Sequence, residues 1–281
     1  MNRLYDRLMI GDLAAGGKWG RVTLKFPIMP LVATPAIILT TLRYSETSKI
    51  VRLATRDLGV QSAIAKGALR PRSRFGAALQ VLSDGQAQLY VKDTRELHTL
   101  AAFDVAHVPL GLAADLDRYA VATALAEVML RFAPADHHPD SFTVLHETLT
   151  TLEGALSAEL PATGLRAMWR LVGALGFAPS LDACALCGTF TSPAGDAAFS
   201  TAEGGILCGS CAGPHAATRL PERARWDLSA LLDIAAPLPS LDRPHFTAHQ
   251  RLLARYVRYH LGEGIELPAL EFWTRRPWLT A

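Results

Sequence analysis

Residues 49–66 read KIVRLATRDLGVQSAIAK, two runs rich in strand-forming residues on either side of Asp57-Leu58-Gly59. Two such runs joined by a short glycine-containing turn predict a β-hairpin. Candidate strands continue on both sides; they are AIILTTLR (36–43), LQVLS (79–83), QAQLYVK (86–92) and ELHTLAAF (96–103). Asp84-Gly85 is one of the strongest hairpin dipeptides and predicts a second hairpin between the middle two.

Five or six short strands in so few residues predict a small closed barrel. The five-stranded OB-fold is the leading candidate, and an SH3-like barrel is the alternative that strand spacing leaves open. We assign this barrel to residues 33–108. Residues 1–32 precede it and show no sustained period, so we expect an ill-ordered extension or a start codon placed too early.

The spacing of apolar residues changes from a strand-like to a helical period after Pro109-Leu110-Gly111. Residues 115–133 are good helix formers and apolar nearly all round, which predicts a buried helix. Further helices are expected over 140–160, with Asp140 or Ser141 as N-cap, and over 164–176, 222–235 and 245–262. The predicted fold class is therefore α+β, an N-terminal barrel followed by a helical domain over 109–281.

Composition excludes several classes of protein. Half of the residues are hydrophobic, which excludes a mostly disordered chain. The longest apolar runs fall far short of the ~20 residues of a membrane-spanning helix, and no secretory signal pattern is found near the start. Four cysteines are too few for a disulfide scaffold of this size. We expect a soluble protein of the cytoplasm.

Charge is distributed unevenly along the chain. Residues 1–100 carry 15 Lys and Arg against 7 Asp and Glu, whereas residues 101–281 carry 13 against 19. A basic front half favours a polyanionic partner, of which nucleic acid is the commonest. Ordinary fluctuation of surface charge is the alternative.

All four cysteines fall in two C-x2-C pairs, Cys184 with Cys187 and Cys208 with Cys211. Two such pairs with twenty residues between them are typical of a structural zinc site closed by four thiolates. Gly188 and Gly209 would allow tight turns, and residues 199–207 would form a short ribbon around Gly204-Gly205. We predict one structural Zn²⁺ per chain within 183–213; unliganded or redox-active cysteines are the alternatives.

The segment KGALRPRSRFG, residues 66–76, places four cations in nine residues. Gly67 and Pro71 predict a loop, along which alternating arginines would project from an extended segment. Guanidinium groups bind phosphates in bidentate fashion, and Phe75 would offer a face for stacking on a base. The predicted DNA-binding residues are Lys49, Arg52, Lys66, Arg70, Arg72, Arg74 and Phe75, with Arg43, Tyr44 and Tyr90 on neighbouring strands. Each could instead be an ordinary surface charge or core aromatic.

The last predicted helix carries Arg251, Arg255 and Arg258 at spacings of four and three, hence on one face. This face would bind an acidic peptide or DNA, or would be an ordinary solvated face beside Glu263 and Glu266.

Catalytic signatures are missing from the sequence. It contains neither a G-x-x-x-x-G-K-[ST] phosphate loop nor a G-x-S-x-G elbow, and the carboxylates of the basic half are scattered rather than clustered. We therefore predict a binding protein rather than an enzyme. The alternatives are a stand-alone barrel that binds RNA, a zinc-stabilised protein-docking scaffold, and a nucleic-acid-modifying enzyme.

Particular strings resemble the RecO family of bacterial recombination mediators. They are YSETSKIV (44–51), the Asp57-Leu58-Gly59 turn, KGALRPRSRFGAALQ (66–80), Arg95-Glu96-Leu97 and the four cysteines. The resemblance covers roughly residues 34–262, and the KGALRPRSRFGAALQ string is its most specific part. Residues 1–28 have no counterpart in the family pattern.

This resemblance implies an N-terminal OB-fold, a helical domain and a zinc-finger-like element. It also implies that the protein binds single- and double-stranded DNA, anneals complementary strands and pairs with RecR. Together the two would help RecA replace single-strand-binding protein, whose acidic C-terminal tail RecO-like proteins contact. The resemblance carries a DNA-binding role to the cations and Phe75 of residues 66–75. The assignment of the tail to Arg251, Arg255 and Arg258 is a hypothesis without a matching motif.

Overall fold

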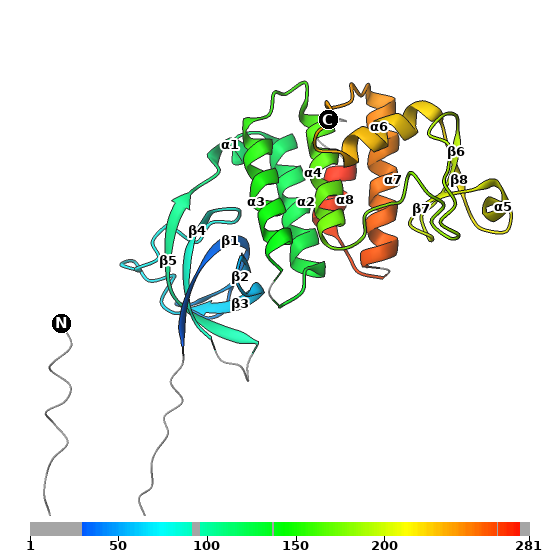
Figure 1. The fold of residues 1–281 in the computed structure, drawn as a ribbon. Helices are drawn as coiled ribbons and strands as arrows, with labels where there is room; N and C mark the ends of the chain where they lie inside the picture. Colours follow the sequence, from blue (N-terminus) through cyan, green and yellow to red (C-terminus); the bar gives the residue numbers. More distant parts are fainter. Residues whose placement is uncertain (1–29, 92–95, 137, 263, 276–281) are drawn as a thin grey trace, which may run out of the picture.

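The computed structural model describes residues 30–91, 96–136, 138–262 and 264–275. Figure 1 shows a β-barrel at one end of the molecule, a bundle of helices in the middle and a small β-element at the other end. The α+β class predicted from the sequence is confirmed. Most of the predicted N-terminal extension, residues 1–29, lies outside the described residues.

Five strands form the barrel. They are β1 (Leu31–Arg43), β2 (Lys49–Thr55), β3 (Gly59–Ala65), β4 (Asp84–Tyr90) and β5 (Leu97–His107). The strands close in the order β1-β2-β3-β5-β4, with every neighbouring pair antiparallel except the parallel pair β3 and β5. Five strands in this Greek-key arrangement make an OB-fold-like barrel.

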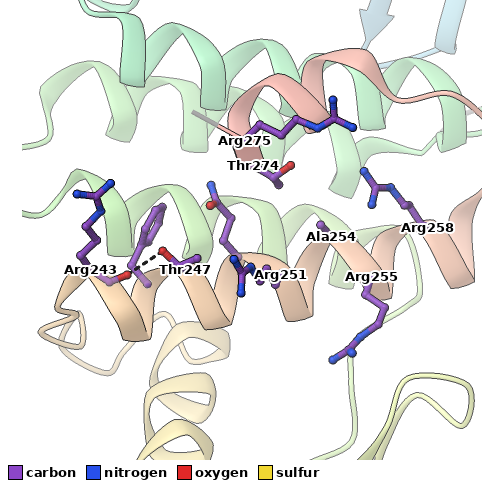
Figure 2. A pocket seen from close by; sticks show the side chains of 10 residues that line it. Arg243, Thr247, Arg251, Ala254, Arg255, Arg258, Thr274 and Arg275 are labelled. Atoms are coloured by element: carbon purple, nitrogen blue, oxygen red, sulfur yellow. Dashed lines mark hydrogen bonds between the residues drawn. The ribbon is translucent and has the colours of Figure 1, made fainter. Parts of the chain in front are cut away.

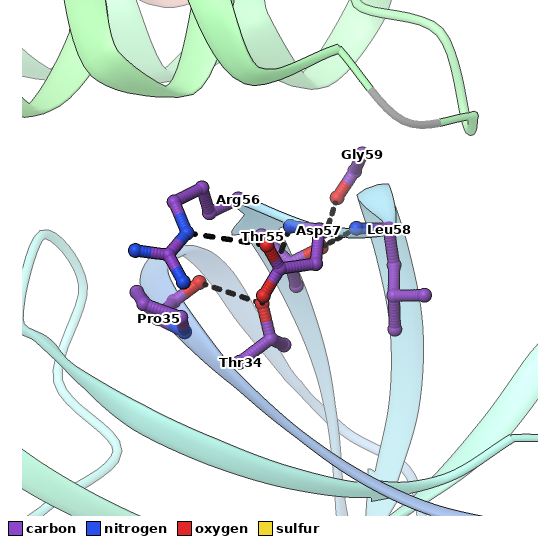
Figure 3. A network of polar contacts seen from close by, with 7 residues as sticks. All are labelled: Thr34, Pro35, Thr55, Arg56, Asp57, Leu58 and Gly59. Carbon is purple, nitrogen blue, oxygen red and sulfur yellow. Dashed lines mark hydrogen bonds and ion pairs between the residues drawn. The ribbon is translucent and has the colours of Figure 1, made fainter.

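The predicted turn between β2 and β3 is confirmed, and Figure 3 shows the polar contacts that hold it. The Asp57 carboxylate accepts a hydrogen bond from the Thr34 hydroxyl at 2.7 Å, and the Thr55 hydroxyl donates to the Gly59 carbonyl at 2.8 Å. Gly59 has a φ of +69°, and a Cβ there would lie 2.1 Å from the Asp136 carbonyl oxygen. The turn therefore needs glycine both for its conformation and for its contact with the helical domain.

The predicted hairpin at Asp84-Gly85 is wrong. Both residues belong to β4, which pairs with β1 and β5, and no strand covers 79–83. A Cβ on Gly85 would lie 2.2 Å from the Asp104 carbonyl oxygen, next to an irregularity in the β4–β5 register. Glycine is therefore explained by close packing of two backbones rather than by a turn.

The helical part follows the barrel without a long connection. Its helices are α1 (Leu110–Ala113), α2 (Leu116–Phe132), α3 (Pro139–Gly154), α4 (Leu160–Ala174), α5 (Gly209–Ala212), α6 (Glu222–Leu232), α7 (Arg243–Leu261) and α8 (Pro268–Arg275). The predicted buried helix is confirmed as α2, with Asp115 as its N-cap. The sequence did not predict α1 or α8. Among the described residues, no helix has the length and apolarity that crossing a membrane requires.

The helix predicted over 140–160 stops at Gly154. The Arg118 guanidinium donates to the carbonyls of Leu152 and Ala155, both at 2.6 Å, and so satisfies the carbonyl groups at the end of α3. Neither predicted N-cap is correct, because α3 begins at Pro139 after His138, with no side-chain cap. Proline suits the first helical position, where its missing N–H would have had no partner.

Two hydrophobic cores meet where the barrel contacts the helices. One core lies inside the barrel and includes Leu53, Leu89 and Leu100. The other belongs to the helices but takes in Ile37 and Val60 from the barrel strands. The outer surface of the barrel is therefore partly buried against helices rather than exposed all round.

Candidate nucleic-acid interface and metal centre

The basic loop after β3 is a series of tight turns. Backbone N–H groups of Arg70, Ser73 and Gly76 each donate to the carbonyl three residues earlier, at 3.0 to 3.1 Å. The prediction of a loop is confirmed, but the extended segment with alternating arginines is wrong. Gly67, with a φ of +74°, and Pro71 favour turns over extended backbone.

Two contacts anchor this loop to the barrel. The Leu69 N–H donates to the Thr47 carbonyl in the β1–β2 turn at 2.9 Å, and the Phe75 ring lies in the barrel core. Phe75 is only 2% exposed, so the predicted stacking of this ring on a base is wrong. An apolar ring gains more from filling the end of the barrel than from remaining in water. Arg74 covers it, with the guanidinium carbon 5.1 Å from the ring centroid.

The cations of the loop are exposed above this anchor. Lys66, Arg70, Arg72 and Arg74 all lie at the surface, and in the described ranges no carboxylate forms an ion pair with any of them. Unpaired guanidinium groups keep their full capacity to bind an anion.

The neighbouring β1–β2 turn adds to this surface. Arg43 and Lys49 are direct cross-strand partners at its base, and Tyr44 is 58% exposed beside them. Tyr90 is also exposed, at the end of β4. We define the basic surface as Arg43, Tyr44, Lys49, Lys66, Arg70, Arg72 and Arg74. Tyr44, rather than Phe75, is its accessible aromatic ring.

Arg52 lies apart from the basic surface. It is half-buried on the outer face of β2, and its Nε atom has no hydrogen-bond partner among the described residues. Burial lowers the pKa of Arg52, and the like charge of Arg131 at the end of α2 lowers it further. Arg52 therefore lies at the junction between the barrel and the helices. The pattern of residues along the strand did not predict this location.

The four cysteines come together in the small β-element, which confirms their predicted clustering. All four Sγ atoms lie within 4.8 Å of one another, and those of Cys187 and Cys208 are 3.7 Å apart. A tetrahedron with zinc–sulfur bonds of about 2.3 Å has sulfur atoms about 3.8 Å apart. The cluster is therefore able to hold a metal ion.

Local backbone geometry supports the two cysteine pairs. Gly188 takes a φ of +70° and donates from its N–H to the Cys184 carbonyl at 2.9 Å. Gly209 needs no such conformation, because it starts α5 with Cys208 as its N-cap. The predicted ribbon is confirmed as β6 (Ala197–Ser200) and β7 (Gly205–Leu207), and a third strand, β8 (Thr218–Leu220), joins it.

The pKa values of two of these thiols are shifted in opposite directions. The Ser210 hydroxyl, 3.5 Å away, is the main cause that lowers the pKa of Cys208 to about 6. Hydrogen bonds to Cys208 and then to Cys187 raise the pKa of Cys211 to about 12, because they stabilise the protonated Cys211 thiol as a donor. A divalent cation bound by the four sulfur atoms would displace these protons and ionise all four thiols.

Side chains that the sequence did not identify fix this element on the helices. Arg225 of α6 is buried and donates to the carbonyls of Leu181, at 3.0 Å, and Ser192. His260 of α7 contacts the Thr201 carbonyl at 2.6 Å. These partners are 44, 33 and 59 residues away in sequence, so local pattern gave no signal for them.

Arg251, Arg255 and Arg258 line a cavity of about 490 Å³ between α7 and α8, together with Arg243 and Arg275. In Figure 2 the Arg258 side chain extends from α7 toward α8, which carries Arg275, whereas the Arg255 side chain points away from α8. Arg258 forms an ion pair with Glu271 at 3.3 Å. The acidic neighbour is therefore Glu271 of α8; of the two residues expected, Glu263 lies outside the described residues and Glu266 forms no ion pair within them.

Comparison with known proteins places both parts of the chain. The family described as recombination protein O, N terminal, matches residues 29–108, and recombination protein O, C terminal, matches residues 113–268. The DNA repair protein RecO of a Nocardioides species is 32% identical, covering 82% of this chain and 95% of its own length. That of Anaeromyxobacter dehalogenans is 33% identical, covering 84% and 94%. The chain therefore belongs to the RecO family of DNA repair and recombination proteins.

Proposed function

We propose that this protein is a recombination mediator that binds single- and double-stranded DNA and anneals complementary strands. With RecR it would help load RecA onto DNA covered by single-strand-binding protein, acting in the cytoplasm. The observation that carries the proposal is the basic surface, whose loop cations are exposed and form no ion pair among the described residues. The family membership and the charge asymmetry of the sequence support it.

The proposed mechanism is electrostatic. Cations that hold two phosphate backbones screen the repulsion between them, so complementary strands meet more often. Tyr44 would stack on a base beside the phosphates. No covalent bond is made or broken, and we propose no enzymatic activity. The division into a DNA-binding barrel over 33–108 and a helical domain over 109–281 is part of this proposal.

The remaining partners belong to the C-terminal half. We propose that Cys184, Cys187, Cys208 and Cys211 hold one structural Zn²⁺, which would neutralise their thiolates and fix the β-element. We further propose that Arg251, Arg255 and Arg258 hold the acidic tail of single-strand-binding protein. An open cavity lined by guanidinium groups suits several carboxylates of one peptide.

Fluorescence anisotropy with a labelled single-stranded oligonucleotide at several salt concentrations tests the proposal. We expect binding to weaken steeply with salt. We expect the variant with Arg70→Ala, Arg72→Ala and Arg74→Ala to have a log–log slope shallower by about 2, since each lost phosphate contact removes about 0.7. Arg223→Ala, which removes one charge from α6 at a site away from the barrel, is the control for a non-specific charge effect and should keep the slope within the change expected for a lost net charge. An unchanged slope in the triple variant would overturn the loop assignment, and a preference for RNA of matched sequence would favour an RNA-binding module.

A further inference from the structure

A groove of about 490 Å³ lies where the barrel meets the end of α2. Arg52 of β2 and Arg131 of α2 both line it, and the hydroxyls of Thr40 and Ser62 lie in its wall. Guanidinium and hydroxyl groups in one concave site are the chemistry that recognises a phosphate.

Strand pairing explains why these residues converge. Arg52 is the direct cross-strand partner of Thr40 on β1 and of Ser62 on β3. Val51 and Leu53 on either side of it are fully buried inside the barrel. Because side chains alternate along a strand, the row from Thr40 through Arg52 to Ser62 faces outward, toward α2.

The two guanidinium groups of this groove are not neutralised. In the parts of the chain that the structure describes, neither Arg52 nor Arg131 forms an ion pair, and the buried Nε of Arg52 donates no hydrogen bond. Glu96 also lines the groove without pairing with either one. The helix C-terminus favours a cation at Arg131, but it gives no reason for a second cation beside it. Two like charges held together with an unsatisfied donor indicate an anionic ligand.

We propose that this groove binds a phosphate of a DNA strand between Arg52 and Arg131, so that the helical domain contributes to the DNA interface. The proposal rests on the proposed function. Lys49 of the basic surface lies three residues before Arg52 on β2, about 10 Å away at 3.3 Å per residue, but on the opposite face of the strand. Leu42 and Ile50, the chain neighbours of Arg43 and Lys49, share the face of Arg52 and also line the groove. A DNA strand bound at the basic surface would reach the groove across Leu42 and Ile50.

The test is Arg131→Gln in the full chain, with the same anisotropy titration over salt. We expect a log–log slope shallower by about 0.7, because one phosphate contact is lost. The melting temperature should change little, because the lost interaction of Arg131 with the helix C-terminus opposes the relief of its repulsion with Arg52. Arg52→Gln should change the slope in the same way, and Arg223→Gln, which removes a charge on α6, should leave it unchanged.

Each of the other possible outcomes of these experiments contradicts one particular proposal. If the loop triple variant loses its salt slope while Arg131→Gln keeps that of the wild type, the groove does not bind DNA and the proposed function stands. If the wild type fails to bind DNA at low salt, the proposed function fails as well. If inorganic phosphate raises the melting temperature of the wild type but not of Arg131→Gln, with equal DNA slopes, the groove takes a free anion and the DNA assignment is wrong.

Discussion

The barrel and the cysteine-containing element are both small β-structures, but only the barrel has a core of its own. Buried residues from all five strands fill the barrel. The strands of the other element are three or four residues long, and its buried Phe199, Ile206 and Leu220 belong to the core of the helices. Strand β6 packs on α7 through Phe199 and Tyr256, with ring centroids 6.2 Å apart.

Because of this difference, polar side chains serve different purposes in the two elements. Because apolar packing fills the barrel, the cations of its basic surface form no ion pair among the described residues and stay available to a ligand. The cysteine element is held in place by polar contacts with the helices, such as those of Arg225 on α6 with backbone carbonyls. Substitutions of the basic-surface cations should therefore affect binding, whereas substitutions of Arg225 or of the cysteines should affect stability.

The largest effect should follow Cys184→Ser. Loss of one ligand should reduce the metal content from one ion per chain and lower the free energy of unfolding by more than about 4 kcal/mol, since loss of a structural metal is among the most damaging changes. Elemental analysis and thermal melting would measure both. No metal in freshly purified wild-type protein would contradict the proposed zinc site.

Phe75→Ala should come next, because it removes a buried ring from the barrel core. We expect a loss of about 3–5 kcal/mol in the free energy of unfolding. Tyr44→Ala is the matched aromatic control: stability should change by less than about 0.5 kcal/mol, while affinity for single-stranded DNA falls by about 1–3 kcal/mol. If Phe75→Ala kept full stability and lost only DNA affinity, the ring would be a stacking surface after all.

The smallest effect on stability should come from His249. This residue of α7 is 2% exposed and lines a pocket together with residues of β8. Burial lowers its pKa below the ordinary 6.5, despite the opposing effect of Asp227. The unfolded chain then binds more protons, so stability is lost as the pH falls below about 6.5.

His249→Leu should remove this contribution, worth up to about 1.4 kcal/mol for each pH unit. Chemical denaturation of both proteins above and below pH 6.5 would measure it. Equal pH dependence in the two proteins would show that His249 is not the group responsible.

Sequence patterns correctly predicted the features that depend on residues close together in the chain. The turn at Asp57–Gly59 and the clustering of the cysteines were both predictable, because each depends on residue types at short spacing. Gly85 was misread because its role depends on Asp104, far along the chain. Phe75 was misread because its polar neighbours in sequence are not its neighbours in space. Arg118 and Arg225 bind distant carbonyls, which no spacing rule indicates.

The most direct test of the whole account is arginine modification by phenylglyoxal in the wild-type protein, with and without a single-stranded oligonucleotide, followed by peptide mass spectrometry. The account predicts that DNA protects Arg70, Arg72 and Arg74 of the barrel loop, while Arg251 and Arg255 of α7 stay reactive. Protection of the α7 arginines with an unprotected loop would place the DNA on the helical domain and contradict it.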